Sequence, residues 1–168
     1  MGATSPLYDL LNQIKQASDT KLYLLSLTAV VALPDICVSL ESTEGRSNGV
    51  AYRAWCAANV GGVFPFITPD DLYSMRCGVV HNGTLSGMKH DVKRVIFVPP
   101  AGVSIVGNIA GDAYIYSAVE FCQTFCIAVH DWYEANRERP IVKANSERMM
   151  QYRVDGLAPY IFGATVIA

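Results

Sequence analysis

The sequence predicts one mainly α-helical domain over residues 1–168, a helical bundle with a small β excursion near residues 93–106. Apolar residues make up 51% of the 168 residues, which is ample for one continuous core. No internal repeat or long linker divides the chain. Charged residues make up only 17%, which is low for a soluble protein, and we therefore expect a homodimer in which a second subunit covers apolar surface.

The first two helices are predicted from their start residues and their apolar content. Ser5 and Pro6 suit the cap and the first turn of a helix that ends near Ala17. A second helix, predicted over 21–41, has apolar residues on every side, as a central buried helix does. Because Pro34 lacks the N–H of a helical hydrogen bond, we expect it to bend or divide this helix.

Two further helices follow a loop rich in turn residues. Residues 50–59 are predicted as a short helix that ends at a pair of glycines. Thr68 and Pro69, followed by two aspartates, form a strong helix start, since threonine caps, proline fits the first turn and carboxylates face the positive end of the helix dipole. This helix should end at Asn82-Gly83, because glycine readily adopts the left-handed conformation that closes helices.

The second half of the chain begins with a change of pattern. β-Branched and aromatic residues around two prolines predict a short two-stranded excursion over 93–106. Residues 116–136 are predicted as a long helix rich in aromatic residues, and 144–152 as a further short helix. The apolar tail from Leu157 has no helix signature and is expected to add an edge strand.

Charge and cysteine content limit the functional classes. A net charge of −2 gives no overall positive field, so we expect no binding to DNA and only a local contact with any RNA. Five cysteines without a CxxC pair lie mostly within apolar runs, which favours a reducing compartment and a cytoplasmic location. We find no signal-peptide pattern and no apolar run that is long and uninterrupted enough for a bilayer, so no membrane partner is expected.

The segment most typical of catalysis is Arg-Cys-Gly-Val-Val-His-Asn-Gly, residues 76–83. In an unbroken helix Arg76 and His81 are about 7.5 Å apart along the axis and roughly 140° apart around it, so they do not stack directly. The long arginine can fold toward the histidine, or the pair can complete one site with its copy in a second subunit. Either arrangement places a fixed cation beside a group that titrates near neutral pH.

This pair suits phosphodiester cleavage in RNA. The reaction needs a base for the 2′-hydroxyl proton, an acid for the leaving 5′-oxygen and a cation for the charge of the phosphorane, and it requires no metal or other cofactor. His81 is expected in the last helical turn, where the dipole favours the imidazolium by a few tenths to about 1 kcal/mol and hence a proton donor. The structural alternative is an arginine bonded to backbone and a histidine that caps carbonyls.

The stretch Asp-Leu-Tyr-Ser-Met-Arg-Cys-Gly-Val-Val-His-Asn-Gly, residues 71–83, resembles the motif helix of uncharacterised bacterial proteins of the HEPN superfamily. Members of that superfamily are helical dimeric ribonucleases and nucleotide-binding proteins whose signature is an arginine followed after four to six residues by a histidine. The resemblance implies that Arg76 and His81 of two subunits meet at a dimer interface and cleave RNA without a metal. Arg76 would neutralise the scissile phosphate, and His81 would be the acid or base.

One position departs from that resemblance. Many active members have a polar residue directly after the arginine, and this chain has Cys77 there. Some members of the superfamily keep the fold as a non-catalytic module that binds RNA or a nucleotide, or that only assembles with a partner. This module is therefore the alternative to the endoribonuclease, and a purely structural dimer is the third interpretation.

Five further residues are candidates for contacts with the substrate: Asn82, Asp35, Lys89, Lys93 and Arg94. Asp35 can orient Arg76 or His81, or it can cap the helix that restarts after the proline, and we prefer the cap. Asn82 can hold a phosphate or simply end its helix. The three basic residues belong to the densest positive stretch of the chain.

A series of possible metal ligands occurs in the predicted long helix. Cys122, Cys126 and His130 recur every four residues. The first and the last are about 12 Å apart along a helix axis, which is too far for ligands of one zinc ion. We expect the two cysteines to be core residues and predict no metal site.

Overall fold

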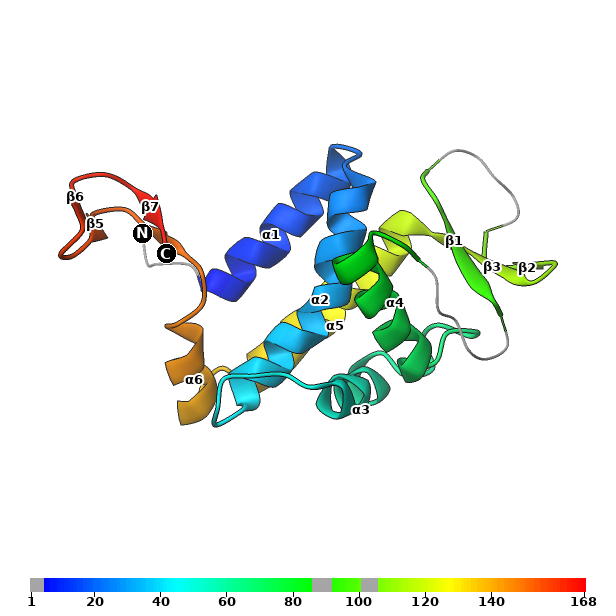
Figure 1. Cartoon of the computed structure of the whole chain (residues 1–168), viewed down its shortest axis with the longest axis horizontal. Helices are drawn as coiled ribbons and strands as arrows, with labels where there is room; N and C mark the ends of the chain where they lie inside the picture. Colours follow the sequence, from blue (N-terminus) through cyan, green and yellow to red (C-terminus); the bar gives the residue numbers. More distant parts are fainter. Residues whose placement is uncertain (1–4, 86–91, 101–105) are drawn as a thin grey trace.

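The computed structural model describes residues 5–85, 92–100 and 106–168. This part of the chain is mainly α-helical with a small β part, as predicted, and Figure 1 shows the helices between a three-stranded sheet at one end and the C-terminal strands at the other. Its helices are α1 (Pro6–Asp19), α2 (Tyr23–Glu41), α3 (Gly49–Asn59), α4 (Pro69–Asn82), α5 (Ala118–Asn136) and α6 (Pro140–Ser146).

Helix α2 is the central helix of the bundle. It contacts α1, α3, α4, α5 and α6, and nine of its 19 residues are buried. Pro34 lies inside it without dividing it, and Figure 1 shows that α2 changes direction midway. By length and apolar content alone α2 is sufficient to cross a membrane, so the expectation that no apolar run is long enough was wrong. In this fold α2 is a core helix.

The buried Tyr52 of α3 is bonded to α2 close to the bend. Its hydroxyl donates to the backbone carbonyl of Val31 over 2.8 Å. Burial raises the pKa of Tyr52 far above its ordinary value, so the hydroxyl remains a donor. The contact fixes α3 against the middle of α2, three residues before Pro34.

Replacing Tyr52 by phenylalanine should lower the free energy of unfolding by about 1 kcal/mol, because one buried hydrogen bond is lost while the ring still fills its place. Urea denaturation of both proteins measures this difference. The matched control is Tyr160→Phe, since Tyr160 is 80% exposed and its hydroxyl contributes no buried contact. Equal losses in the two variants would contradict a role for the bond to Val31.

The β part is larger than the sequence predicts. Strand β1 (Arg94–Val98) pairs in parallel with β3 (Ala113–Ser117), and β2 (Ile109–Ala110) pairs with β3 in antiparallel fashion. The sheet therefore has three strands and extends to residue 117, where only two strands over 93–106 were expected. The predicted helix start at Tyr116 is also wrong, because Tyr116 belongs to β3 and the Ser117 hydroxyl caps α5 by accepting from the Glu120 N–H.

An aromatic cluster joins this sheet to the bundle. Phe121 of α5 is fully buried at its centre, and ring centroids 4.8–6.1 Å away surround it. The surrounding rings come from the α3–α4 loop, from β1, from β3 and from α5: Phe64, Phe97, Tyr116 and Phe125. The cluster fixes the sheet at the N-terminal end of α5.

The C-terminal part differs from its prediction. The short helix predicted over 144–152 begins at Pro140 and ends at Ser146, because the proline takes the first turn of α6. The tail forms two small antiparallel ladders in place of one edge strand. Strand β4 (Tyr152–Arg153) pairs with β7 (Val166–Ile167), and β5 (Gly156–Leu157) pairs with β6 (Ile161–Phe162).

Candidate functional site around Arg76 and His81

Both ends of α4 are fixed by the residues that the sequence indicates. The Thr68 hydroxyl accepts from the Asp71 N–H, and the Asp71 carboxylate accepts from the Thr68 N–H over 3.1 Å, which is a capping box. At the other end Gly83 adopts a φ of 67°, and its N–H donates to the carbonyl of Val79. The helix that carries Arg76 and His81 therefore begins and ends as predicted.

Replacing Thr68 by alanine should cost about 1 kcal/mol of stability, because the N–H of Asp71 loses its acceptor. Thermal or urea denaturation measures the loss. Ser74→Ala within the same helix is the matched control, since alanine is the better helix former there and no cap is affected. A loss of the same size in the control would show that the cap makes no specific contribution.

Arg76 is held by an ion pair with α2. Its Nε lies 2.6 Å from Oδ2 of Asp35, and the two side chains are only 23% and 18% exposed. Burial lowers the pKa of Arg76, but the hydrogen bond to Asp35 and the charge of that carboxylate outweigh this effect and raise the net pKa above its ordinary value. Arg76 is thus a permanently charged group with a fixed orientation.

The same guanidinium contacts His81. Nη1 of Arg76 lies 3.2 Å from Nε2 of His81, so the length of the arginine side chain spans the separation around the helix. A guanidinium has donors only, and therefore Nε2 must be the unprotonated acceptor in this contact. The imidazole is exposed on the last turn of α4. While this hydrogen bond is formed, the guanidinium occupies Nε2 of His81, and a ligand that takes over the Nη1 donor would make Nε2 accessible.

Asp35 orients Arg76, and it does not cap a restarted helix. Since α2 continues through Pro34, no new helix begins there that needs a cap. The capping role preferred on the sequence is therefore wrong, and the orienting alternative agrees with the ion pair. Asp35, Arg76 and His81 form a continuous chain of contacts from α2 to the end of α4.

Arg53 of α3 lies next to this chain of contacts and was not predicted to belong to the site. The guanidinium carbon of Arg53 lies 4.1 Å from the centre of the Tyr73 ring, and its Nε bonds to Asp70. Tyr73 also contacts Cys77, which raises the pKa of the tyrosine. Arg53 thus places a second cation over Tyr73, which precedes Arg76 by three residues in α4. Only its positive charge within a short predicted helix could have suggested it.

The remaining predicted residues are less closely placed. Asn82 follows His81 at the exposed end of α4. Lys93 and Arg94 lie at the start of β1, where Arg94 faces Asp112 at 3.5 Å, and within the described residues no hydrogen bond or ion pair joins them to Arg76 or His81. Lys89 lies outside the described residues.

The cysteines of α5 lie in an apolar setting. Cys122 is buried and Cys126 is partly buried, and burial raises their pKa values to about 12 and about 11. His130 is paired with the neighbouring Asp131 at 3.2 Å. Over residues 5–85, 92–100 and 106–168 no group of three His, Cys, Asp or Glu side chains is placed to hold a metal ion.

Comparison of the chain with family models, with curated proteins and with solved structures finds no match. A proposal for the function therefore depends on the geometry around Arg76. Asp35, Arg76 and His81 line none of the cavities of about 410, 500 and 680 Å³ in the described part of the chain. A single subunit consequently presents the pair on its surface, outside those cavities.

Proposed function

We propose that the chain is a metal-independent endoribonuclease of the HEPN type whose site forms between two copies of α4. The contact of the Arg76 guanidinium with both Asp35 and the His81 imidazole supports this proposal. A fixed cation that touches an imidazole supplies two of the three groups that RNA cleavage by the 2′-hydroxyl needs. The third group is an acid for the leaving oxygen.

A scissile phosphate would compete with His81 for the N–H groups of Arg76. In the free protein Nη1 of Arg76 donates to the imidazole, while Nε is occupied by Asp35. A phosphate oxygen that takes over the Nη1 donor frees Nε2 of His81 to accept the 2′-hydroxyl proton. The ion pair with Asp35 keeps the guanidinium in place through this exchange. One subunit thus provides the cation and the base.

A second subunit would provide the acid and complete the cleft. Among the described residues His81 is the one imidazole near Arg76, so a protonated His81 from another copy is the simplest donor to the leaving oxygen. Both helices that carry the pair also expose apolar side chains, as expected of an interface: Leu24 is 82% exposed and Leu25 is 62% exposed in the first turn of α2, and Val80, which precedes His81 in α4, is 43% exposed. Helix α4 runs antiparallel to α2 and brings its C-terminal end toward this part of α2 (Figure 1).

The test is cleavage of a mixed-sequence RNA by the purified protein in EDTA, with analysis of the product ends. We expect 2′,3′-cyclic phosphate ends and a dimer in sedimentation velocity. Leu24→Asp should yield a folded monomer that no longer cleaves. Ile127→Asp is the matched control, because Ile127 is 61% exposed on α5 and should leave both dimer and cleavage intact. Cleavage by a monomeric Leu24→Asp variant would contradict the composite site.

The second candidate is a HEPN-like module that binds RNA or a nucleotide without cleaving it. Cys77 after the arginine favours this candidate, as does the partial satisfaction of Arg76 by Asp35 within one subunit. Such a module predicts a dimer that retards RNA in a gel shift and leaves it intact, with weaker retardation for Arg76→Ala. If the protein neither binds nor cleaves RNA, the function that remains is assembly with a partner through the surface of α2 and α4.

A further inference from the structure

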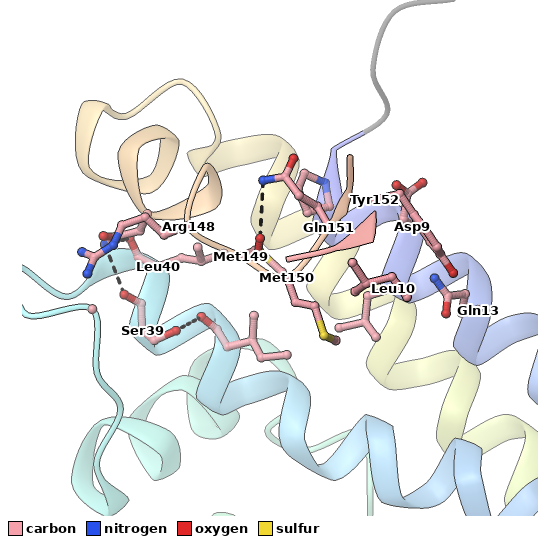
Figure 2. A pocket seen from close by; sticks show the side chains of 15 residues that line it. Asp9, Leu10, Gln13, Ser39, Leu40, Arg148, Met149, Met150, Gln151 and Tyr152 are labelled. Atoms are coloured by element: carbon pink, nitrogen blue, oxygen red, sulfur yellow. Dashed lines mark hydrogen bonds between the residues drawn. The ribbon is translucent and has the colours of Figure 1, made fainter. Parts of the chain in front are cut away.

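A cavity of about 410 Å³ lies on the other side of α2 from α4, between α1, α2, α6 and the strands β4 and β7. This volume falls within the range of small-molecule sites. Figure 2 shows the side chains around it, with Met150 and Leu10 in the middle and Asp9 and Gln13 at one end. Most of its wall is apolar, and a few polar groups gather at the end near Gly45.

Asn145 provides a hydrogen-bond acceptor of known orientation in this wall. Its side chain is only 9% exposed, and its Nδ2 donates to three backbone carbonyls at the C-terminal end of α2, those of Ser39, Leu40 and Ser42. These contacts settle which end of the amide is nitrogen. The carbonyl oxygen Oδ1 is left without a hydrogen bond among the described residues, and it belongs to a side chain that lines the cavity.

Arg148 provides donors next to this acceptor. Within the described part of the chain no ion pair or hydrogen bond occupies its exposed guanidinium. A Cβ built on Gly45 would lie 3.7 Å from Nη1 of Arg148 and 3.8 Å from Oδ1 of Asn145. The two polar atoms therefore converge on the open space above this glycine, where no side chain intervenes.

We propose that this cavity binds a small molecule that presents an amide with its C=O and N–H on the same side, on an apolar or aromatic body. The C=O would accept from Arg148, and the N–H would donate to Oδ1 of Asn145. Primary carboxamides and the lactam edges of uracil-type rings share this chemistry. A trans peptide group does not, because its C=O and N–H point in opposite directions.

The rest of the wall selects against charged alternatives. A carboxylate would suit Arg148 but would face the unprotonated oxygen of Asn145, and an anionic group further along the cavity would approach Asp9. The side chains of Ile36, Leu10 and Met149 offer apolar contact to a ring. Tyr152 of β4 adds an aromatic face. The expected ligand is therefore neutral and flat.

Benzamide and uridine serve as probes of the two amide sources, with binding followed by NMR shifts of the backbone amides of residues that line the cavity. We expect at least one of the two compounds to bind. The compound that binds more tightly shows whether the site prefers a carboxamide or the lactam edge of a uracil-type ring. N,N-dimethylbenzamide and 3-methyluridine lack the N–H and should bind about tenfold or more weakly than their parents. Equal binding of parent and methylated compounds, or no shift from either parent, would overturn the proposal.

Substitutions in the cavity wall test the same contacts by changing the protein in place of the ligand. Arg148→Gln should weaken binding of the parent compound about tenfold. Lys143→Gln removes a charge from α6 outside the cavity wall and should bind like the wild type. Leu10→Trp fills the apolar part and should abolish binding. Unchanged affinity in both Arg148→Gln and Leu10→Trp would place the ligand elsewhere.

Discussion

RNA cleavage is expected to fall by roughly 10²–10⁴-fold in either His81→Ala or Arg76→Ala. In the proposed mechanism, loss of the imidazole removes the group that takes or gives a proton, and loss of the guanidinium removes the charge that stabilises the phosphorane. Rates of cleavage of a labelled RNA, measured under single-turnover conditions, report the fall. Because two groups of one site act together, the double variant should be little slower than the slower single variant.

The variants Arg76→Lys and Asp35→Asn distinguish the contribution of the positive charge at residue 76 from that of its orientation. Lysine keeps the positive charge but lacks the planar fork that contacts both Asp35 and His81 at once, so it should restore only part of the rate. Asp35→Asn keeps Arg76 and His81 but removes the carboxylate that orients Arg76, so it should mainly lower the rate at saturating RNA. Circular dichroism and sedimentation show whether each variant remains a folded dimer. Full activity of Arg76→Ala in a folded dimer would refute the assigned role.

Phe121→Ala is expected to lower the free energy of unfolding by about 3–5 kcal/mol. The ring is fully buried and contacts four other aromatic rings, so its removal leaves a cavity where α5 meets the sheet. A loss of this size is a large part of the stability of an ordinary domain. Equilibrium urea denaturation at 25 °C gives the difference.

Phe162→Ala is the matched control for this prediction. Phe162 is 72% exposed on β6, and a surface substitution of this kind should change stability by no more than about 0.5 kcal/mol. The two variants remove the same atoms, so their difference isolates burial from the chemistry of the residue. A loss below about 1 kcal/mol in Phe121→Ala would show that the aromatic cluster contributes little.

The parts of the fold that were predicted well depend on local chemistry. Thr68 and Pro69 at the start of α4 and Gly83 at its end act on neighbouring backbone groups, so the sequence is sufficient to place the helix. The bend of α2 at Pro34 is local for the same reason. Arg76 and His81 could be singled out because both lie within one such helix.

The parts that were missed depend on distant contacts. Asp35 and Arg76 are 41 residues apart, and the sequence offers no measure of whether two such residues meet. Strand β3 is stabilised by pairing with β1, so its residues were assigned in part to the helix that follows. Arg53 was overlooked because its position over Tyr73 arises only when α3 and α4 pack together.

The bend in α2 has a consequence for how this protein can evolve. Proline is the least favourable residue for a helix interior, yet it stands directly before the carboxylate that holds Arg76. Many replacements of Pro34 would make α2 a better helix, and we expect a straighter α2 to shift Asp35 relative to Arg76. For the proposed site, we therefore expect the stability of α2 and the position of Asp35 to place opposite demands on residue 34.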